Sequence, residues 1–383
     1  MLSRVLIAIL RLWSSGRTRG ELQHDAIQSL LIVELSRLGD VVAMLRSLGT
    51  LARSFPRARI HLLIDGRYAP LIESLQLDVV VHLIHKSDSV IGLTHAILAS
   101  RKINSDLAIS ISPSKRNAIS TLASQSRSKV GYLSHINSLT PFLVRPPIES
   151  FGCMLASEEV YGMQNIADRA SKICRSLGIG DTTTGQSIEI RSSVFETTTS
   201  RLKERGVLPE SPFVVIHPFS GWSYRNWDIQ RFEHLADRII KSTSFSVVFV
   251  CAREEEDMMH KLSEKLRGNR RVSLFSSSSI PETAVVIQHA SVFIGNDSGP
   301  LHLASALGLT VVGLFGPASP ELTAPPHLKG ATLYKKVECS PCDQRKCVRP
   351  EAPCMSLLSV DEVMSQVVKC LAHENSRSAT AHA

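Results

Sequence analysis

The chain has 383 residues and carries 43 Lys and Arg against 35 Asp and Glu, which gives a net charge of +8. Hydrophobic residues make up 43% of it, so wholesale disorder is excluded and a packed core is expected. An aromatic content of only 5%, with no recognised reader motif, argues against nucleic-acid binding. The length favours two domains, and the charge favours an anionic partner.

Residues 1–28 form a basic N-terminal extension with an amphipathic start. On a helical wheel of residues 1–13, two arginines lie opposite an apolar face made of Leu2, Leu6, Ile9 and Trp13. This pattern predicts a helix at a membrane interface. An ordinary packing helix and a secretory signal are the alternatives, and the signal is disfavoured because its apolar stretch is short. No apolar run approaches the roughly 18 residues of a spanning helix, so a cytoplasmic protein, soluble or at a membrane surface, is expected.

The first half of the chain alternates apolar runs of strand length with helical patterns. The run 29–35 is followed by a glycine turn at 36–40 and a helical pattern, and 90–101 is a second helical segment. Such alternation indicates a parallel sheet with helical crossovers. Further strands are expected at 59–64, 79–84 and 106–111.

A polar segment between about 178 and 211 separates this series from a second one. Strands are expected at 213–217, 246–251, 272–275, 292–294 and 311–314, and helices at 228–240, 254–266, 281–289 and 299–307. The predicted fold class is therefore α/β, with two Rossmann-like, doubly wound parallel-sheet domains at 29–185 and 205–370. Ligands of such sheets bind beyond the carboxyl ends of the strands, so we expect the site in a central cleft between the domains.

Carboxylates follow two of the predicted strands. Asp40 opens the helix after the first strand, where it can act as a helix cap or as the general base that takes a proton from an incoming hydroxyl. Glu254 and Glu255 follow a strand of the second domain. They can favour the first turn of a helix through its dipole, or contact the hydroxyl pair of a ribose.

Two further loops of the second domain have the composition of an anion site. The segment 217–228 holds Ser220 and Arg225 at a helix entrance, where hydroxyl and guanidinium groups suit a phosphate. The alternative is a surface loop with Trp227 buried in the core.

The second of these loops, Gly295-Asn296-Asp297-Ser298-Gly299-Pro300-Leu301-His302, again joins a strand to a helix. Asp297 or Ser298 can cap that helix. The functional interpretation has the amides of Ser298 and Gly299 meeting a diphosphate, Asp297 a sugar hydroxyl, and His302 completing the anion site. The turn 315–320 would close the same pocket.

Four cysteines, Cys339, Cys342, Cys347 and Cys354, cluster within a basic segment. A structural zinc site, redox-labile disulfides and free thiols all remain open, because the spacing is not the paired C-x2-C of a zinc ribbon. The sequence has no G-x-G-x-x-G, no P-loop and no Asp-x-Asp pair for a divalent cation. A phosphate bound here would be neutralised by side-chain cations and helix ends.

With these residues in view, the chain resembles the ADP-heptose-using lipopolysaccharide heptosyltransferases of glycosyltransferase family nine. The most specific motif is the loop 295–304, followed by Phe315-Gly316-Pro317; Leu35 to Asp40 and His217 to Trp227 resemble two other family motifs. The resemblance runs from about residue 30 to 368. It implies a GT-B fold, Asp40 as catalytic base, and a donor site of Ser220, Arg225, Glu254 or Glu255, Asp297, Ser298, Gly299 and His302.

The segment holding Lys115 and Arg116 resembles part of the family's acceptor domain, and a cysteine cluster recurs in many relatives. We therefore expect an inverting transferase that needs no cofactor or catalytic metal and uses an anionic glycolipid acceptor at a membrane surface. The alternatives are a family-nine enzyme with another nucleotide sugar or a non-lipid acceptor, and a nucleotide-sugar-binding protein without catalysis.

Overall fold

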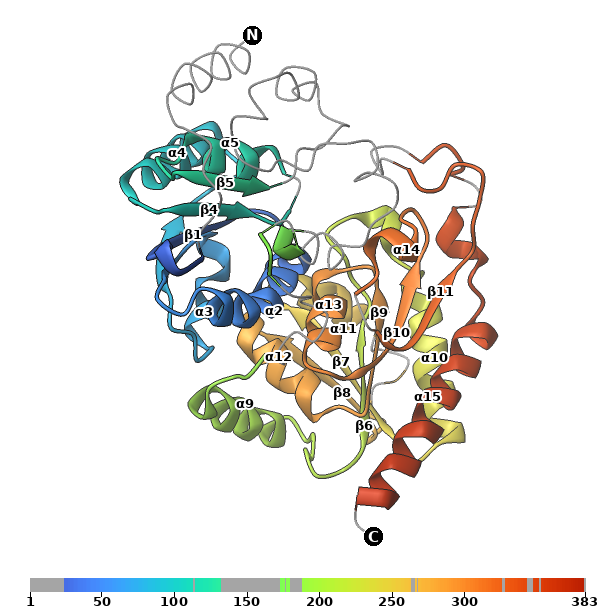
Figure 1. Cartoon of the computed structure of the whole chain (residues 1–383). Helices are drawn as coiled ribbons and strands as arrows, with labels where there is room; N and C mark the ends of the chain where they lie inside the picture. Colours follow the sequence, from blue (N-terminus) through green and yellow to red (C-terminus); the bar gives the residue numbers. More distant parts are fainter. Residues whose placement is uncertain are drawn as a thin grey trace. The chain divides into compact units, whose positions relative to one another are not determined.

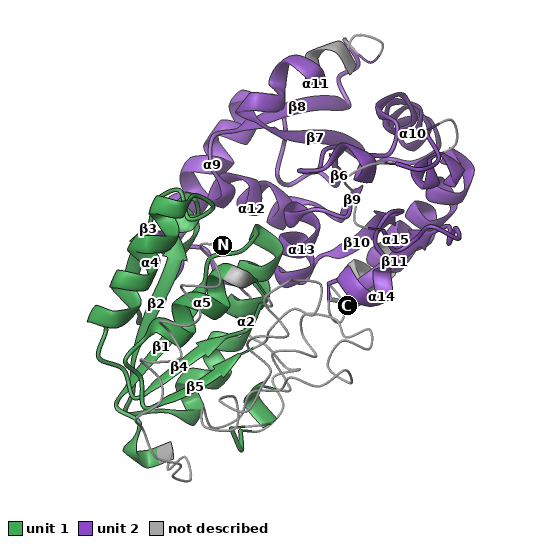
Figure 2. Ribbon diagram, turned by 90° about the horizontal axis from the view of Figure 1, so that it is seen from above, with its two compact units in different colours: residues 1–72, 77–186 green, residues 73–76, 187–383 purple. Residues whose placement is uncertain are grey.

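The computed structural model describes residues 24–112, 114–131, 173–175, 177–179, 188–262, 266, 268–325, 328–342, 347–350 and 353–381. The predicted interfacial helix of residues 1–13 lies outside this part of the chain. No helix within the described ranges is long and apolar enough to cross a membrane. The chain divides into two compact units, residues 1–72 with 77–186 and residues 73–76 with 187–383 (Figure 2).

The first unit is a five-stranded parallel sheet in the order β3-β2-β1-β4-β5. Its central strand has four fully buried residues in succession, Leu30 to Val33, as expected for a strand covered on both faces. In Figure 1, α4 and α5 lie on one face of the sheet and α2 on the other. Its elements are β1 (Ser29–Glu34), α2 (Leu38–Ser54), β2 (Arg59–Asp65), α3 (Ala69–Glu73), β3 (Val80–Ile84), α4 (Val90–Lys102), β4 (Leu107–Ser110), α5 (Lys115–Ala123) and β5 (Ser128–Gly131).

The second unit is a six-stranded parallel sheet in the order β11-β10-β9-β6-β7-β8. Helices α10 and α15 contact each other along one face, and α12 contacts both α9 and α13 (Figure 1). The elements are α9 (Ser192–Glu204), β6 (Phe213–His217), α10 (Ile229–Ser242), β7 (Ser246–Ala252), α11 (Glu256–Leu262), β8 (Val272–Ser277), α12 (Ile280–His289), β9 (Val292–Asn296), α13 (Gly299–Ala306), β10 (Thr310–Phe315), α14 (Pro320–Thr323), β11 (Lys329–Tyr334) and α15 (Val360–Ala381).

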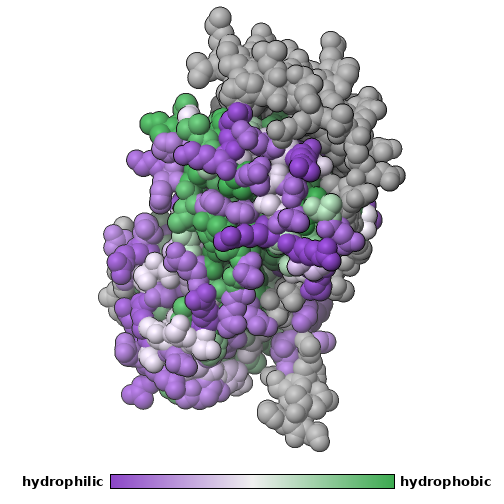
Figure 3. Space-filling view, turned by 60° about the vertical axis from the view of Figure 1, so that its left-hand side comes forward, coloured by the Kyte–Doolittle hydropathy of each residue, from purple (hydrophilic) through white to green (hydrophobic). Residues whose placement is uncertain are grey.

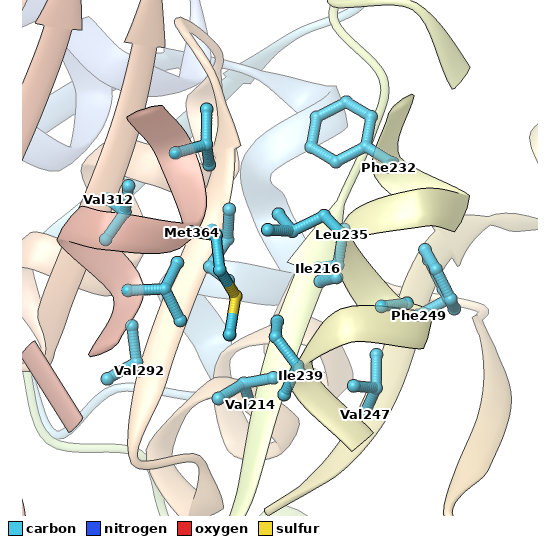
Figure 4. Packing of buried hydrophobic residues seen from close by; sticks show 14 of the residues in the cluster. Val214, Ile216, Phe232, Leu235, Ile239, Val247, Phe249, Val292, Val312 and Met364 are labelled. Atoms are coloured by element: carbon cyan, nitrogen blue, oxygen red, sulfur yellow. The ribbon is translucent and has the colours of Figure 1, made fainter. Parts of the chain in front are cut away.

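The core of the second unit joins α10 and α15 to the centre of the sheet. Leu235 and Ile239 of α10 point toward Ile216 and Val214 of β6, and Met364 of α15 lies among them (Figure 4). All five side chains are buried. Since each fully buried aliphatic side chain contributes about 1.5–3 kcal/mol of transfer free energy, this packing holds β6 rigidly. The loop that leaves β6 therefore starts from a fixed point.

The structure agrees with the predicted strand and helix order and adds elements. Strands β5 and β11 and helix α15 were not predicted. The predicted range 205–370 also omits α9, which the structure places in the second unit, where Thr199 Oγ1 lies 2.9 Å from His289 Nε2 of α12. A short bridge between Leu75 and Ile190 explains why residues 73–76 belong to the second unit.

Candidate functional site

In the second unit, the candidate site lies where the strand order reverses. β6 is the first strand of the unit, and its neighbours are β7, the next strand in the chain, and β9, which comes later. The loops after β6 and β9 therefore leave the same carboxyl edge of the sheet toward helices on opposite sides. Ligands of open α/β sheets bind outside such a switch point.

Asn296, the last residue of β9, ties these two loops together. Its Oδ1 accepts a hydrogen bond from the Trp227 backbone N at 3.0 Å, and its Nδ2 donates to the Pro218 carbonyl oxygen at 2.6 Å. Trp227 is buried in the core, as the structural alternative predicted, and its Nε1 donates to the Leu358 carbonyl at 2.9 Å. Sequence reasoning missed Asn296, although a buried amide between an apolar strand and Asp297 was an available signal.

Arg225 and Asp297, one from each loop, form an ion pair. Arg225 Nη1 lies 2.9 Å from Asp297 Oδ2, and the two side chains are only 16% and 4% exposed. Thr323 Oγ1 donates to the same carboxylate oxygen at 3.4 Å. The guanidinium carbon lies 5.8 Å from the centre of the Trp222 ring. The structure thus brings together two residues assigned to one ligand, and it already balances the positive charge of Arg225.

Helix α13 begins next to Asp297, and its N-terminus has no side-chain cap. Ser298 is the N-cap residue, but its Oγ makes no capping hydrogen bond and is buried without a partner among the described residues. The N–H groups from Gly299 onward carry the positive end of the helix dipole. Such an N-terminus can bind a phosphate group. A ligand oxygen could also accept a hydrogen bond from the Ser298 hydroxyl, which would offset the free-energy cost of burying that group unpaired.

Two histidines at this edge are neutral at pH 7. Desolvation lowers the pKa of His217, the last residue of β6, to about 4. Desolvation and then the positive charge of Arg225 lower the pKa of His302 to about 4 as well. A neutral His302 can donate one hydrogen bond, and its contact with an anion stays a prediction.

The hydroxyl of Ser220 is engaged within its own loop. Its Oγ lies 2.7 Å from both the Trp222 carbonyl oxygen and Asn226 Oδ1. This network shapes the loop that carries Arg225, so Ser220 has a structural role here. A direct contact with a phosphate remains a prediction.

The two glutamates after β7 have different surroundings. Glu255 Oε2 accepts a hydrogen bond from the Ala252 backbone N at 2.9 Å, and desolvation raises the pKa of its carboxyl. It therefore has the capping role. Glu254 is exposed, so of the two it is the one open to a ribose hydroxyl pair, and this role stays a prediction.

In the first unit, the strand order reverses around β1, which pairs with β2 on one side and β4 on the other. Asp40 lies in the first turn of α2 at this edge, and its Oδ2 accepts a hydrogen bond from the Arg37 backbone N at 3.3 Å. Its side chain is partly exposed. The capping role is thus present, and the role as base stays a prediction.

Glu34, the last residue of β1, is a site residue that the sequence analysis did not single out. Its carboxyl group is completely buried at the end of an apolar strand, and it receives hydrogen bonds from Ser36, Ser112 and Asn117. Desolvation, and then the charge of Asp40, raise its pKa to about 7. A single acidic residue after four apolar ones was the available signal.

Lys115 and Arg116 are the first two residues of α5, which begins beyond the carboxyl end of β4. Their helix is capped by Ser114, whose Oγ accepts a hydrogen bond from the Asn117 N at 3.1 Å. Arg116 is partly exposed. Both residues thus start from the same edge of the sheet as Asp40, and their contact with an acceptor remains a prediction.

The cysteine segment packs against the turn after β10. The Cys342 backbone N donates to the Pro317 carbonyl at 3.0 Å, and a Cβ atom on Gly316 would meet Cys354 Sγ at 2.9 Å. A side chain at position 316 would therefore force the side chains of Cys354 and Met355 to shift. Burial, and then the neighbouring cysteines, raise the pKa of the Cys354 thiol.

The four thiols of this segment, Cys339, Cys342, Cys347 and Cys354, are all free, so the disulfide alternative is not realised here. Within the described ranges, which omit 343–346, no three potential ligands are placed to hold a metal ion. A structural zinc at these four cysteines stays a prediction.

Two doubly wound parallel sheets are the architecture of the GT-B fold, and the second switch point adds an uncapped helix and a guanidinium. Residues 173–352 match the family model described as glycosyltransferase family 9 (heptosyltransferase). The matched part holds the motif loops at 217–227 and 295–304, in agreement with the resemblance seen there.

Individual relatives and solved structures agree with this assignment. The chain is 23% identical over 289 residues to lipopolysaccharide heptosyltransferase 3 of Escherichia coli K12, covering 73% of this chain and 79% of that protein. A family 9 glycosyltransferase structure from Veillonella parvula aligns with a TM-score of 0.75 at 18% identity, over 92% and 100% of the two chains. The E. coli heptosyltransferase WaaC with ADP aligns with a TM-score of 0.61 at 16% identity, over 89% and 99%. The GT-B fold is thereby confirmed.

Proposed function

We propose that this glycosyltransferase moves a heptose from ADP-heptose to a lipopolysaccharide-core or related glycolipid acceptor, with inversion at the anomeric carbon and without a catalytic metal. The observation that carries the proposal is the second switch point, where Arg225 lies beside the uncapped N-terminus of α13 and the unpaired hydroxyl of Ser298. A diphosphate needs such a combination of cation and backbone donors. The names of the relatives, and the ADP held by WaaC, support the choice of donor.

On the donor side, the protein stabilises the charge that develops on the leaving diphosphate. Arg225, the amides of Ser298 and Gly299 and the α13 dipole are fixed before the reaction, so they need no reorganisation as the bond breaks. Arg225 exchanges part of its contact with Asp297 for the phosphate. The Asp297 carboxylate is then available to a hydroxyl of the transferred sugar.

On the acceptor side, Asp40 is the general base. It accepts the proton of an acceptor hydroxyl while that oxygen forms a bond to the anomeric carbon, and the bond from that carbon to the ADP oxygen breaks on the opposite face. One bond forms and one breaks, and the electron pair of the broken bond leaves with ADP. This displacement inverts the configuration of the transferred heptose.

An exposed apolar face on α4 supports a membrane-bound acceptor at the cytoplasmic side of a bilayer. Val90, Ile91 and Leu98 are 71%, 69% and 50% exposed, and Arg101 and Lys102 end the same helix. Hydrophobic residues gather at the surface on one face of the molecule (Figure 3). Apolar side chains with flanking cations suit an interface that contains anionic lipids.

The test is a thermal-shift titration of the purified chain with ADP, UDP, GDP and CDP, with and without EDTA. A ligand at 100 times its Kd adds about 2.7 kcal/mol of stability. We expect selective stabilisation by ADP that EDTA does not change, followed by heptose transfer from ADP-heptose to a core-deficient lipopolysaccharide. Preference for another nucleotide would favour a family 9 enzyme with a different donor, and donor binding without transfer or hydrolysis would favour a catalytically silent binding protein.

A further inference from the structure

Glu34 ends β1 at the first switch point, and its burial needs an explanation. The four residues before it are apolar and completely buried, and its own side chain is also completely buried. An apolar residue here would avoid the desolvation cost, because a buried carboxyl group costs free energy unless it is well paired. A buried ionisable group beside a candidate active site is often functional.

The contacts of Glu34 hold the turn that leads to Asp40. Glu34 Oε1 accepts from the Ser36 backbone N at 3.0 Å and from Asn117 Nδ2 at 3.0 Å, while Oε2 accepts from Ser112 Oγ at 2.6 Å. Asn117 also accepts from the Leu35 backbone N at 2.8 Å. The carboxyl group thus bridges β1, the loop after β4 and α5, and it fixes the backbone just before α2.

Other charged groups also face this position. The negative charges of Asp65, Asp40 and Glu34 contribute to raising the pKa of Tyr68 to about 12, after desolvation as the main cause, while Arg67 opposes them. Asp65 is itself paired with Arg67, with Asp65 Oδ1 2.9 Å from Arg67 Nε. In its described contacts, Glu34 is bound only by neutral donors.

Glu34 and Asp40 differ in their exposure, and this separates their roles. When two carboxyl groups interact, the one in the drier site takes the shared proton first. Glu34 is completely buried and Asp40 is partly exposed. As the solution becomes more acidic, Glu34 therefore takes up its proton first, and Asp40 then loses the negative neighbour that makes it more basic.

We propose that Glu34 is a positioning residue for Asp40: it holds the turn that carries the base and, when it is ionised, makes Asp40 a stronger base. The proposal rests on the proposed function, in which Asp40 is the base. It further implies that ionisation of Glu34 makes Asp40 more basic, so turnover should rise across the pH range in which Glu34 loses its proton.

The kinetic test compares the wild type with Glu34→Gln, which keeps the shape and an acceptor oxygen but cannot ionise. In the wild type, kcat should rise across about pH 7. In the variant this rise should disappear, with kcat at pH 8 lower by roughly 3- to 10-fold and with KM for the donor unchanged. The same inflection in Glu34→Gln would overturn the proposal, as would a change in KM alone.

A second measurement does not depend on catalysis. Carbon-13 NMR of a chain labelled at the glutamate carboxyl carbons should show one resonance that titrates near pH 7, is absent from Glu34→Gln, and titrates at lower pH in Asp40→Asn. Titration of that resonance in the ordinary glutamate range, or no effect of Asp40→Asn, would overturn the inference even if the enzyme transfers heptose. Wild-type protein that shows this coupling but transfers no sugar would instead refute the proposed function. If Glu34→Gln fails to fold, the wild-type and Asp40→Asn titrations still decide.

Discussion

The two units place a buried ionisable residue at the same topological position, and they use opposite chemistry there. Glu34 ends β1 and His217 ends β6, and each strand is the one around which its sheet reverses order. Desolvation favours the neutral form of both groups. It is the main cause that raises the pKa of Glu34 to about 7 and lowers the pKa of His217 to about 4. The shared backbone edge thus supplies the location of a site, while in the proposed function one side chain and its neighbours decide whether that edge handles protons or anions.

The largest expected effect concerns the proton-handling edge. Asp40→Asn keeps an oxygen acceptor for the Arg37 amide, so α2 should remain capped. We expect kcat to fall by about 10²- to 10⁴-fold, the usual contribution of a general base, while the Kd of ADP stays unchanged by calorimetry. Asp88→Asn, an exposed carboxylate of the same unit, is the matched control. Wild-type turnover in Asp40→Asn would remove Asp40 from the mechanism.

A smaller effect is expected at the anion-binding edge. Arg225→Ala should weaken ADP binding by about 10- to 100-fold, because a hydrogen bond to a charged group contributes about 1.5–3 kcal/mol. Arg225→Lys should lose less, since it keeps the charge but not the bidentate geometry. The control is Arg238→Ala, in which an exposed pair with Asp361 is lost. Equal losses in Arg225→Ala and Arg238→Ala would contradict the assigned role.

The opposite chemistry of the two edges also predicts opposite pH dependences of stability. For His217, the pKa is about 4 in the folded chain and 6.5 in the reference state. The contribution of His217 to the free energy of unfolding is therefore present above pH 6.5 and is lost as pH falls toward 4. For Glu34, the pKa is about 7 in the folded chain and 4.5 in the reference state. Its contribution to the free energy of unfolding is therefore present below pH 4.5 and is lost as pH rises toward 7.

Calorimetric melting at pH 5 and pH 8 checks this contrast. Replacing Glu34 by Gln should stabilise the chain relative to wild type more at pH 8 than at pH 5, with a difference on the order of 2 to 3 kcal/mol. His217→Asn should stabilise the chain relative to wild type more at pH 5 than at pH 8. Parallel curves for wild type and both variants would show that neither residue is shifted.

The smallest effect should come from the apolar face of α4. The double substitution Val90→Ser with Ile91→Ser should reduce sedimentation with vesicles of anionic lipid a few-fold, since only two exposed side chains are changed. Leu208→Ser, which alters an apolar residue of the second unit that is 52% exposed, should have no effect. Unaltered sedimentation of the α4 variant would show that this surface does not contact the membrane.

The central strands and the edge strands β3 and β8 could be predicted from the sequence, and the edge strands β5 and β11 could not. β6 was predicted at its observed bounds because its five residues are all buried. β11, in contrast, lies at an edge with no buried residue in its pattern, so it lacks a continuous apolar run. β5 is only four residues long and contains Lys129, whose Nζ donates to the Leu122 carbonyl at 3.0 Å.

The candidate site was predicted in part for a similar reason. Residues with familiar local chemistry, such as Arg225 and Ser298, stand out in a loop between a strand and a helix. Asn296 and Glu34 act through partners that are distant in the sequence, 78 positions away for Pro218 and 83 for Asn117. No local pattern reveals such partners, and only the pairing of the strands brings them together.

The indole of Trp227 links the loop after β6 to the end of the chain. Its Nε1 donates to the carbonyl of Leu358, 131 positions later, immediately before α15. Because α15 packs on α10, β9 and β10, the loop that carries Arg225 and the C-terminal helix should open as one cooperative unit in amide hydrogen exchange. A chain truncated before α15 would therefore lose protection in that loop as well.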